Sequence, residues 1–348
     1  MAVRRATPSR KKEHVDLVLR RRVGFKGKTT GLEALEFANN ALPELDFEDV
    51  RTSTTFLGHT LAFPLMISCM TGGYAGALAI NRALAEVCAE RRIAMGVGSQ
   101  RQALEDAQYH KTFTVVREAA PKIPIVGNIG AAEVACMRDA APAQRLVDLV
   151  RADAFAVHLN PLQELLQPEG NPKFRGVLNG IALLVKGLGV PVIVKEIGAG
   201  ISGAVARRLL DVGVRHIDVA GAGGTSWAGV ETLRSRDRRM GSLLWDWGIP
   251  TADAVREVAA LKSDYAEMTL IASGGIANGI DAAKCIGLGA DLVASARLLL
   301  LALRAGGRDG LRASLDSWER EFRSTMFLTG SASIADLRKV PLISTRMP

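Results

Sequence analysis

Short apolar runs alternate with longer amphipathic runs along the chain from about residue 62 onward. Eight short runs are almost continuously apolar and rich in valine and isoleucine, which is typical of parallel strands buried on both faces. They cover residues 65–70, 93–98, 125–129, 155–160, 192–197, 216–220, 269–273 and 292–296. Helical periodicity is clearest at 78–91, 131–150, 202–212, 251–261 and 278–287. The pattern therefore predicts eight successive strand–helix units.

Eight such units over roughly 240 residues predict an α/β fold, the (β/α)8 or TIM barrel. Several strands run straight into glycine-rich turns, and helices end at glycines such as Gly213 and Gly287. The alternative is a doubly wound open sheet, but no GxGxxG sequence follows an early strand. The sequence favours the closed barrel.

Two segments exceed a minimal barrel. Residues 1–60 precede the first strand, and residues 224–250 form a long insertion after strand six. Long excursions from a scaffold usually serve as lids or partner surfaces. We expect a single domain, with an N-terminal extension at 1–60 that acts as a lid and a catalytic barrel at 61–348.

The charge is concentrated at the N-terminus. The 348 residues carry a formal net charge of +8, and residues 1–28 alone hold ten basic and two acidic side chains. The rest of the chain is neutral, which excludes a nucleic-acid-binding surface spread over the whole protein. The basic start suits nucleic acid, an anionic membrane or a phosphorylated small molecule.

The cysteine usage and the hydropathy suggest a cytoplasmic protein. None of the four cysteines forms a CxxC pair, so neither a disulfide framework nor a zinc site is indicated. The first residues contain no apolar segment of the secretory type. The longest uncharged run, residues 60–81, is broken by proline and glycine, so no membrane-spanning helix is expected.

Polar side chains gather where the predicted strands end, which is where such barrels place their active sites. The last two strands end in SGGI (273–276) and ASAR (294–297), where glycine turns and a helix N-terminus predict a phosphate site. An ordinary βα turn is the alternative. The polar residues at the strand ends are Ser68, Thr71, Ser99, Gln100, Arg101, Asn128, His158, Asn160, Gln163, Glu164, Lys195, Glu196, Asp218, Thr225, Ser295 and Arg297.

Three of these motifs allow more than one interpretation. Lys195 lies within the apolar run VIVKEI, so its ammonium group forms an ion pair with Glu196 or a neighbour, forms a Schiff base, or lies beside an electron-rich ring. In HLNPLQE (158–164), Glu164 either helps to hold Mg²⁺ together with phosphate oxygens and water, or opens a helix. RKKEH (10–14), taken alone, is typical of a solvated helix face.

Ten motifs occur in a fixed order along the chain, and HLNPLQE and GGTSW are the most specific of them. Together, from Arg10 to about Leu300, they resemble the type 2 isopentenyl diphosphate isomerases, which are FMN-dependent flavoproteins. The motifs are RKKEH (10–14), SCMTGG (68–73), GSQR (98–101), GNIG (127–130), HLNPLQE (158–164), VKEIG (194–198), DVAGAGGTSW (218–227), WGIPT (247–251), ASGGI (272–276) and ASAR (294–297).

The resemblance implies an isomerase of isoprenoid biosynthesis that interconverts isopentenyl diphosphate and dimethylallyl diphosphate by proton transfer. It also implies the cofactors FMN, Mg²⁺ and NADPH, with NADPH serving only to reduce the flavin, and a homo-oligomer, either a tetramer or an octamer. The partner would be a small-molecule diphosphate, with neither nucleic acid nor a membrane involved. Part of the basic N-terminus would then neutralise the diphosphate as a lid.

The resemblance further assigns roles to individual residues. Glu164 would bind Mg²⁺, and Gln163, His158 and Lys195 would be catalytic, with Lys195 beside the flavin ring. The expected FMN ligands are Ser68, Cys69, Met70, Thr71, Ser99, Asn128, Lys195, Thr225, Gly275, Ile276, Ala277, Ala296 and Arg297. The expected substrate ligands are Arg10, Lys11, His14, Ser99, Gln100, Arg101, Asn160 and Gln163. Two departures from the family pattern, Lys12-Glu13 in place of an acidic pair and Cys69 in place of alanine, fall where the side chain is not needed for chemistry.

Other classes of protein fit the sequence less well. A flavin-dependent 2-hydroxy-acid oxidase needs a histidine base, yet AGAGGTSW after strand six has none, and His158 is the only histidine at the end of a predicted strand. A dehydrogenase of nucleotide precursors would need a nucleophilic cysteine in the same loop. The density of polar residues at the strand ends counts against a non-enzymatic barrel, and the neutral body against a nucleic-acid-binding protein.

Overall fold

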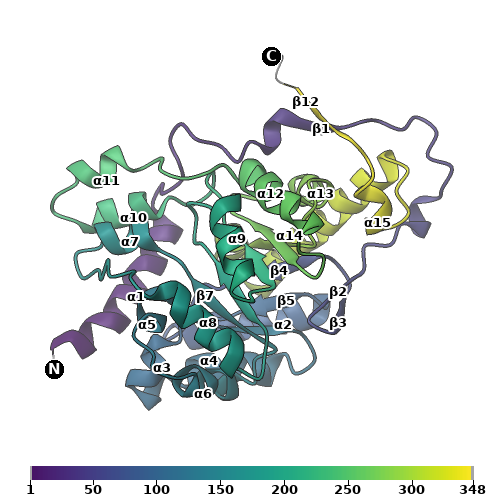
Figure 1. The fold of residues 1–348 in the computed structure, drawn as a ribbon. Coiled ribbons are helices and arrows are strands. Elements are labelled where there is room, and N and C mark those ends of the chain that lie inside the picture. Colours follow the sequence, from purple (N-terminus) through teal and green to yellow (C-terminus); the bar gives the residue numbers. More distant parts are fainter. Residues whose placement is uncertain (1, 346–348) are drawn as a thin grey trace.

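In the computed structural model, which describes residues 2–345, eight parallel strands form a closed barrel (Figure 1). Going around the barrel, the order is β10-β11-β4-β5-β6-β7-β8-β9, so neighbours in sequence are neighbours in space. The prediction of a (β/α)8 barrel is confirmed. The strands are β4 (Leu65–Ile67), β5 (Ala94–Gly96), β6 (Ile125–Gly130), β7 (Ala154–His158), β8 (Val192–Lys195), β9 (His216–Asp218), β10 (Thr269–Ser273) and β11 (Leu292–Ser295).

Most strands end earlier than the hydropathy pattern predicts. Strand β4 stops at Ile67 rather than at Met70, and β5 stops at Gly96 rather than at Gly98. One further backbone bond follows each strand, since the N–H of Ser68 donates to the carbonyl of Ser295 and the N–H of Val97 donates to the carbonyl of Val126, both at 2.9 Å. The N–H of Gly98 then donates to the loop carbonyl of Thr71 at 2.8 Å. The residues after each strand are therefore loop residues that can turn toward the barrel mouth.

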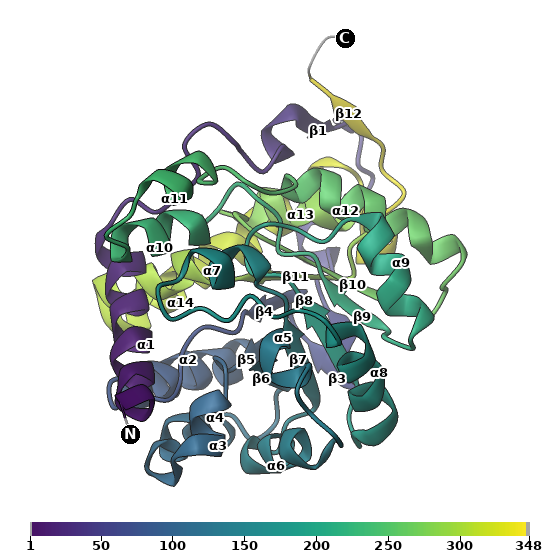
Figure 2. The same cartoon turned by 60° about the vertical axis from the view of Figure 1, so that its left-hand side comes forward.

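Helices surround the barrel on its outer face (Figures 1 and 2). The predicted helix over 131–150 is wrong as one element, because it divides at residues 135–140 into two helices. The second begins where Asp139 accepts the N–H of Ala141 and Pro142 occupies the first turn. The helices are α2 (Ala77–Arg91), α3 (Arg101–Glu105), α4 (Lys111–Ala119), α5 (Ala131–Val134), α6 (Ala141–Val150), α7 (Pro161–Leu166), α8 (Val177–Gly187), α9 (Gly203–Asp211), α12 (Thr251–Ala259), α13 (Gly279–Gly287), α14 (Arg297–Leu328) and α15 (Ile334–Leu337).

The elements of the N-terminal extension pack at different places on the barrel. Helix α1 (Ala2–Arg20) lies beside the insertion, whereas β1 (Leu35–Phe37) pairs with the C-terminal strand β12 (Leu342–Ser344). The hairpin of β2 (Thr54–Phe56) and β3 (His59–Leu61) inserts Phe56 and Leu61 into the interior cluster of the barrel. His59 contacts Asp153, which precedes β7, so this hairpin closes the N-terminal end. Of these elements, α1 is therefore the candidate for a lid.

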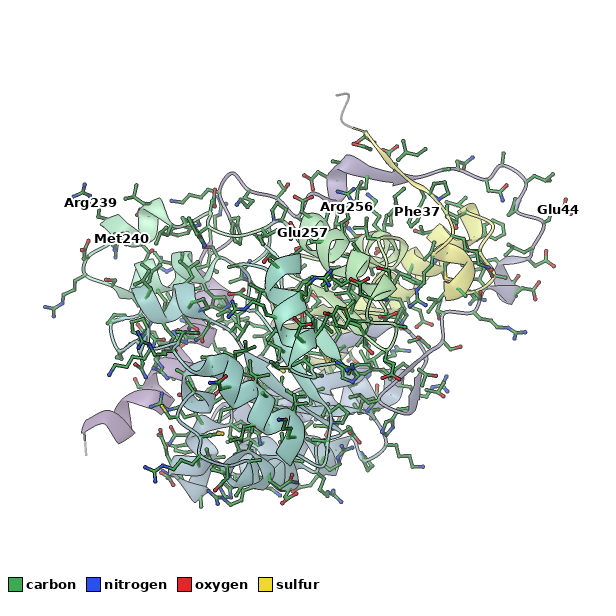
Figure 3. All side chains as sticks on the ribbon, in the orientation of Figure 1. Phe37, Glu44, Arg239, Met240, Arg256 and Glu257 are labelled. Carbon is green, nitrogen blue, oxygen red and sulfur yellow. The ribbon has the colours of Figure 1, made fainter. Side chains whose placement is uncertain are left out.

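The insertion after β9 contains α10 (Trp227–Arg234) and α11 (Arg239–Leu243). Helix α10 contacts both α7 and α1, and the three gather on one side of the barrel in Figures 1 and 2. Arg239 and Met240 of α11 lie at the outer edge of the insertion in Figure 3, away from the barrel. No helix within residues 2–345 combines the length and apolar character needed to cross a membrane.

Candidate active site

A cavity of about 540 Å³ opens at the C-terminal ends of the barrel strands. All eight strand ends contribute to its wall, and α1 covers one side with Arg10, Lys11, His14, Val15 and Val18. The volume is in the range of pockets that bury a cofactor or a drug-sized ligand. Every residue to which the family resemblance assigns a role lines this cavity except Gln100 and Ala277.

The side chain of Gln100 serves the scaffold instead. It is fully buried, its Oε1 accepts the N–H of Asn128 at 2.9 Å, and its Nε2 donates to the carbonyl of Leu146 at 3.0 Å. With both polar ends engaged, it fixes the backbone of Asn128 rather than reaching a ligand. Ala277 lies at the exposed start of α13, where its N–H donates to Asp281. The geometry therefore does not bring either residue to the cavity.

The part of the cavity at the C-terminal ends of β10 and β11 is built mainly from backbone atoms. Gly274 and Gly275 have positive φ values of 102° and 71°, and a Cβ added to Gly224 would lie 2.5 Å from the nitrogen of Gly275. The N–H groups of Gly275, Ile276 and Ala296 have no acceptor within residues 2–345. Ile276 is buried, and Gly275 and Ala296 are half-buried at the cavity wall. Unpaired backbone N–H groups that face one cavity suit an anion such as a phosphate. We refer to this part of the cavity as the glycine cradle.

Arg297 follows the cradle but has its guanidinium group turned toward α1. Its Nε donates to the carbonyl of Val18 at 2.8 Å, and one terminal nitrogen donates to the carbonyl of Arg21 at 3.2 Å. Burial lowers the pKa of this guanidinium from its ordinary value. Arg297 thus links the end of β11 to the C-terminal end of α1 as well as lining the cavity.

Lys195 provides a cation on the floor of the cavity. Its Nζ lies 3.4 Å from Oδ2 of Asp218 and donates to the carbonyl of Glu196 at 2.5 Å. Lys195 and Asp218 are paired positions of the β8–β9 ladder, and Asp218 is fully buried. The ion pair expected of Lys195 is therefore made with Asp218. The carboxylate of Glu196 instead accepts the N–H groups of Ile197 and Gly198.

His158 is neutral near pH 7. Burial, followed by the charge of Lys195, lowers its pKa to about 3. Its Nδ1 lies 2.9 Å from Oδ1 of Asn128, on the next strand. An imidazole with this pKa can orient a ligand by hydrogen bonding, but it does not supply a proton as an imidazolium group.

Polar side chains that follow β7 line the side of the cavity opposite the cradle, and Glu231 of α10, which does not itself line the cavity, contacts them. The amide nitrogen of Asn160 donates to Gln163 and to Glu164, both at 3.0 Å. Nε2 of Gln163 donates to Oε1 of Glu231 at 3.1 Å, and Nε2 of His14 lies 2.8 Å from the same oxygen. The sequence analysis missed Glu231, a fully buried carboxylate in the amphipathic run WAGVETLR.

Glu231 is held ionised by its neighbours. Its burial favours the protonated form, but the hydrogen bond and charge of His14, the charge of Arg234 and the amide of Gln163 together outweigh it and lower its pKa. The sequence offered one signal for this residue, since a glutamate on an otherwise apolar stretch of helix must find partners when it is buried. Nothing in the sequence showed that α1 and α7 supply them.

Glu164 is the one carboxylate of the HLNPLQE motif. Its Oε1 accepts from Asn160, and its Oε2 accepts the N–H of Asn171 at 2.7 Å. No group of three His, Cys, Asp or Glu side chains within the described residues is arranged to hold a metal ion. A divalent cation at Glu164 would therefore need most of its oxygen ligands from a phosphorylated ligand and from water, as Mg²⁺ commonly does.

Lys11 docks α1 onto the loops after β4 and β5. Its Nζ donates to the carbonyls of Gly72, at 2.9 Å, and Ser99, at 2.6 Å. Burial, followed by the charge of Arg10, lowers the pKa of Lys11 to about 7. A solvated helix face is thus excluded for this part of RKKEH, although Lys12 on the same turn is exposed.

The fold and the site define a barrel of the FMN-dependent class. The model of the family described as FMN-dependent dehydrogenase matches residues 3–126 and 130–344. Solved structures of the same fold include a mandelate oxidase, with a TM-score of 0.67 and 20% identity over 97% of this chain and 98% of that one. A flavocytochrome b2 variant has a TM-score of 0.68 and 18% identity over 96% of this chain and 83% of that one. At these identities the structures show the fold alone.

Curated relatives specify the family more closely. A protein of Chlorobaculum parvum is 49% identical over 97% of both chains, and one of Chlorobium luteolum is 50% identical over 96% of this chain and 95% of that one. A protein of Methanothermobacter thermautotrophicus is 44% identical over 97% of this chain and 93% of its own length. All three are named isopentenyl-diphosphate delta-isomerase, and the chain belongs to this family.

Proposed function

We propose that this protein interconverts isopentenyl diphosphate and dimethylallyl diphosphate by proton transfer, using reduced FMN and Mg²⁺, as a step of isoprenoid biosynthesis. The observation that carries the proposal is the presence of two anion-binding ends in one cavity. The glycine cradle lies at one end, and the cations Arg10, Lys11 and Arg101 line the other part of the wall. The name shared by the curated relatives supports the reaction.

The unpaired N–H groups of the cradle, and the absence of Cβ atoms at Gly224, Gly274 and Gly275, fit the phosphate of FMN. When bound and reduced by NADPH, with no net redox change, the flavin would supply the proton donor and acceptor of the reaction. Lys195 would stabilise negative charge on the ring. We propose as further FMN ligands the lining residues Ser68, Cys69, Met70, Thr71, Ser99, Asn128, Thr225, Gly275, Ile276, Ala296 and Arg297.

The chain's own residues would bind and orient the substrate. Arg10, Lys11 and Arg101 would neutralise the diphosphate, and Glu164 would hold Mg²⁺ against it. Gln163, fixed by Glu231 and Asn160, would orient the allylic carbons, and His158 would contribute a neutral hydrogen-bonding group. Helix α1 of the N-terminal extension would exclude water, which strengthens each of these interactions.

Turnover with controlled flavin redox state tests the proposal. The purified protein is expected to bind FMN and to convert isopentenyl diphosphate only after the flavin is reduced and Mg²⁺ is added. Glu164→Gln should weaken the dependence on Mg²⁺, and Gln163→Ala should lower kcat while FMN stays bound. Turnover with the flavin kept oxidised, or NADPH consumed in proportion to product, would contradict the proposal.

The rival function is a flavin-dependent 2-hydroxy-acid oxidase, and a mandelate oxidase is among the solved structures with this fold. Such an enzyme needs a histidine base at the strand ends, but the loop after β9 contains none and the pKa of His158 is about 3. Product assays with 2-hydroxy acids distinguish the two functions. A cytoplasmic location and a tetrameric or octameric state stay predictions, which fractionation and light scattering would check.

A further inference from the structure

Arg234, at the end of α10, forms ion pairs with two carboxylates from distant segments and with one from its own helix. Its Nε lies 2.9 Å from Oε2 of Glu13, and its two terminal nitrogens lie 2.7 Å from Oε2 of Glu231 and 2.9 Å from Oε1 of Glu169. The Arg234 side chain is only 4% exposed. It does not line the cavity, so its role cannot be direct contact with a ligand there.

None of the three carboxylates lines the cavity, but each is linked to a different residue that does. Glu13 lies in α1 beside His14, which lines the cavity. Glu169 lies in the segment after α7, the segment whose Asn171 N–H donates to Glu164. Glu231 uses its second oxygen, Oε1, for both His14 and Gln163. One guanidinium group therefore contacts the lid helix, the segment that orients Glu164 and the carboxylate that orients Gln163.

The geometry requires arginine. A guanidinium group presents donors in a rigid planar fork, and here all three nitrogen atoms are used by different partners. A lysine also has three N–H donors, but they share one nitrogen atom, so it could not reach all three carboxylates in the directions that the three guanidinium nitrogens reach. Because Glu231 is fully buried, loss of the guanidinium would also leave this charge with His14 and Gln163 as its remaining polar partners.

We infer that Arg234 is a positioning residue that fastens α1 over the cavity through Glu13 and, through Glu231, sets the direction of Gln163. Closure of the lid and orientation of the catalytic amide are thereby coupled in one ion-pair cluster. The part that concerns catalysis rests on the proposed isomerase function, whereas the fastening of α1 does not.

Hydrogen–deuterium exchange of the α1 amides tests the fastening without substrate. The FMN-loaded protein is compared with Glu13→Gln, Arg234→Lys and the control Arg239→Gln, which removes an arginine charge at the outer edge of the insertion (Figure 3). Glu13 is half exposed, so its loss should speed exchange about threefold, as expected for a surface ion pair. Arg234→Lys should speed it further, and Arg239→Gln should leave it unchanged.

Steady-state kinetics test the coupling. Glu13→Gln loosens only the lid, so it should raise KM about threefold with kcat nearly unchanged. Arg234→Lys should raise KM and also lower kcat about tenfold or more, because Gln163 loses its fixed direction. FMN affinity and the melting temperature, measured in parallel, should change little in Glu13→Gln.

Two results would overturn the inference. One is unchanged exchange of α1 in both Glu13→Gln and Arg234→Lys, and the other is an Arg234→Lys protein with a raised KM but a normal kcat. If wild-type protein shows no isomerase turnover at all, the proposed function fails, while the exchange data still decide whether Arg234 fastens α1. A poorly folded Arg234→Lys protein would be recognised by its melting temperature, and Glu13→Gln then carries the test of the lid.

Discussion

The two ends of the cavity are built from different materials. The glycine cradle at β10 and β11 offers backbone N–H groups, and its neighbours approach so closely that a Cβ on Gly224 would lie 2.5 Å from a backbone nitrogen. The other end is backed by a set of side chains that we call the charged cluster, namely Glu13, His14, Glu231 and Arg234, of which His14 lines the cavity. The cluster joins positions about 220 residues apart in sequence.

The difference predicts how each end responds to change. Backbone groups are fixed by the barrel, so the cradle should tolerate changes of salt and pH but not the addition of a methyl group. The charged cluster depends on side chains that must be brought together by α1 and α10, so single charges should matter there. Substitutions that change packing at the glycine cradle, or charge at the other end, test whether the two ends differ in this way.

The largest effect is expected for Lys195→Met, which tests whether the Lys195–Asp218 ion pair is as sensitive to the loss of one charge as the charged cluster. The substitution would leave the fully buried Asp218 without its cation. Removing one partner of a buried ion pair typically costs about 3–5 kcal/mol. Urea denaturation of the apoprotein should show a loss of free energy of unfolding of this size.

The double variant Lys195→Met/Asp218→Asn is the control. It removes the unpaired charge, and the amide introduced in place of the carboxylate could still use Ser273 and the N–H of Ala220, which now contact Oδ1 of Asp218. The double variant should therefore be more stable than Lys195→Met alone. If the two lose the same stability, Asp218 is not the group that Lys195 compensates.

Gly224→Ala should give the next largest effect, on FMN affinity. Its added Cβ would press against Gly275, although the φ angle of Gly224 is outside the left-handed region. We expect the FMN dissociation constant to rise at least about tenfold, which corresponds to about 1.4 kcal/mol. Titration of the apoprotein with FMN, followed by flavin fluorescence, measures it.

Gly58→Ala is the matched control for this substitution. Gly58 has a φ of 77°, but a Cβ there meets nothing within 4 Å. The variant should lose about 1 kcal/mol or more of stability through backbone strain and bind FMN normally. Equal FMN affinity in Gly224→Ala and wild type would show that the cradle can widen, and the contrast between the two ends would be weakened.

The contrast also explains which features the sequence could reveal. Strands β4 to β11 were predictable because β-branched runs such as VIV at 192–194 mark strands buried on both faces, and the cradle was predictable because glycines in SGGI follow such a strand. The charged cluster could not be predicted from the sequence. Glu231 and Arg234 lie on a helix of ordinary amphipathic pattern, and only the path of the insertion brings them against Glu13.

The sequence also did not reveal the direction of the Gln100 side chain or the role of the hairpin at 54–61, because both depend on contacts between distant elements. Gln100 stands beside two lining residues in sequence, but the turn into α3 directs its side chain to Asn128 and Leu146. The hairpin at 54–61 closes the N-terminal end of the barrel, although no signal in the sequence separates it from the lid. Strand and turn signals are local, whereas these contacts depend on how the elements pack.

A smaller effect is expected at Lys11, where α1 meets the loops after β4 and β5. The quantity that changes is the number of protons taken up when an anion binds. The pKa of about 7 lies below the ordinary value of lysine near 10.4, so docking of α1 releases a proton between these values and becomes more favourable as the pH rises through that window. A bound diphosphate favours the ammonium form instead. At pH 8.5, binding of inorganic diphosphate with Mg²⁺ should therefore take up a proton at Lys11.

Calorimetric titration in two buffers of different ionisation enthalpy measures this uptake. Lys11→Met is the control, because proton changes of diphosphate itself occur in both proteins. The wild-type protein should take up nearly one proton more per molecule than the variant does. Equal proton changes in the two proteins would mean that Lys11 remains with the carbonyls of Gly72 and Ser99 when the anion binds.

The smallest effect is expected for Cys69→Ala, which sharpens the claim that the cradle side depends on backbone rather than on side chains. Burial raises the pKa of the Cys69 thiol to about 12, so it is neither a nucleophile nor a charged ligand near pH 7. Its loss should cost about 1 kcal/mol of stability through the small cavity left beside Gly96. FMN affinity should change less than about threefold and turnover should persist, since the N–H groups of Gly275, Ile276 and Ala296 are untouched. A loss of FMN comparable to that of Gly224→Ala would show that a side chain, not the backbone, governs this end of the cavity.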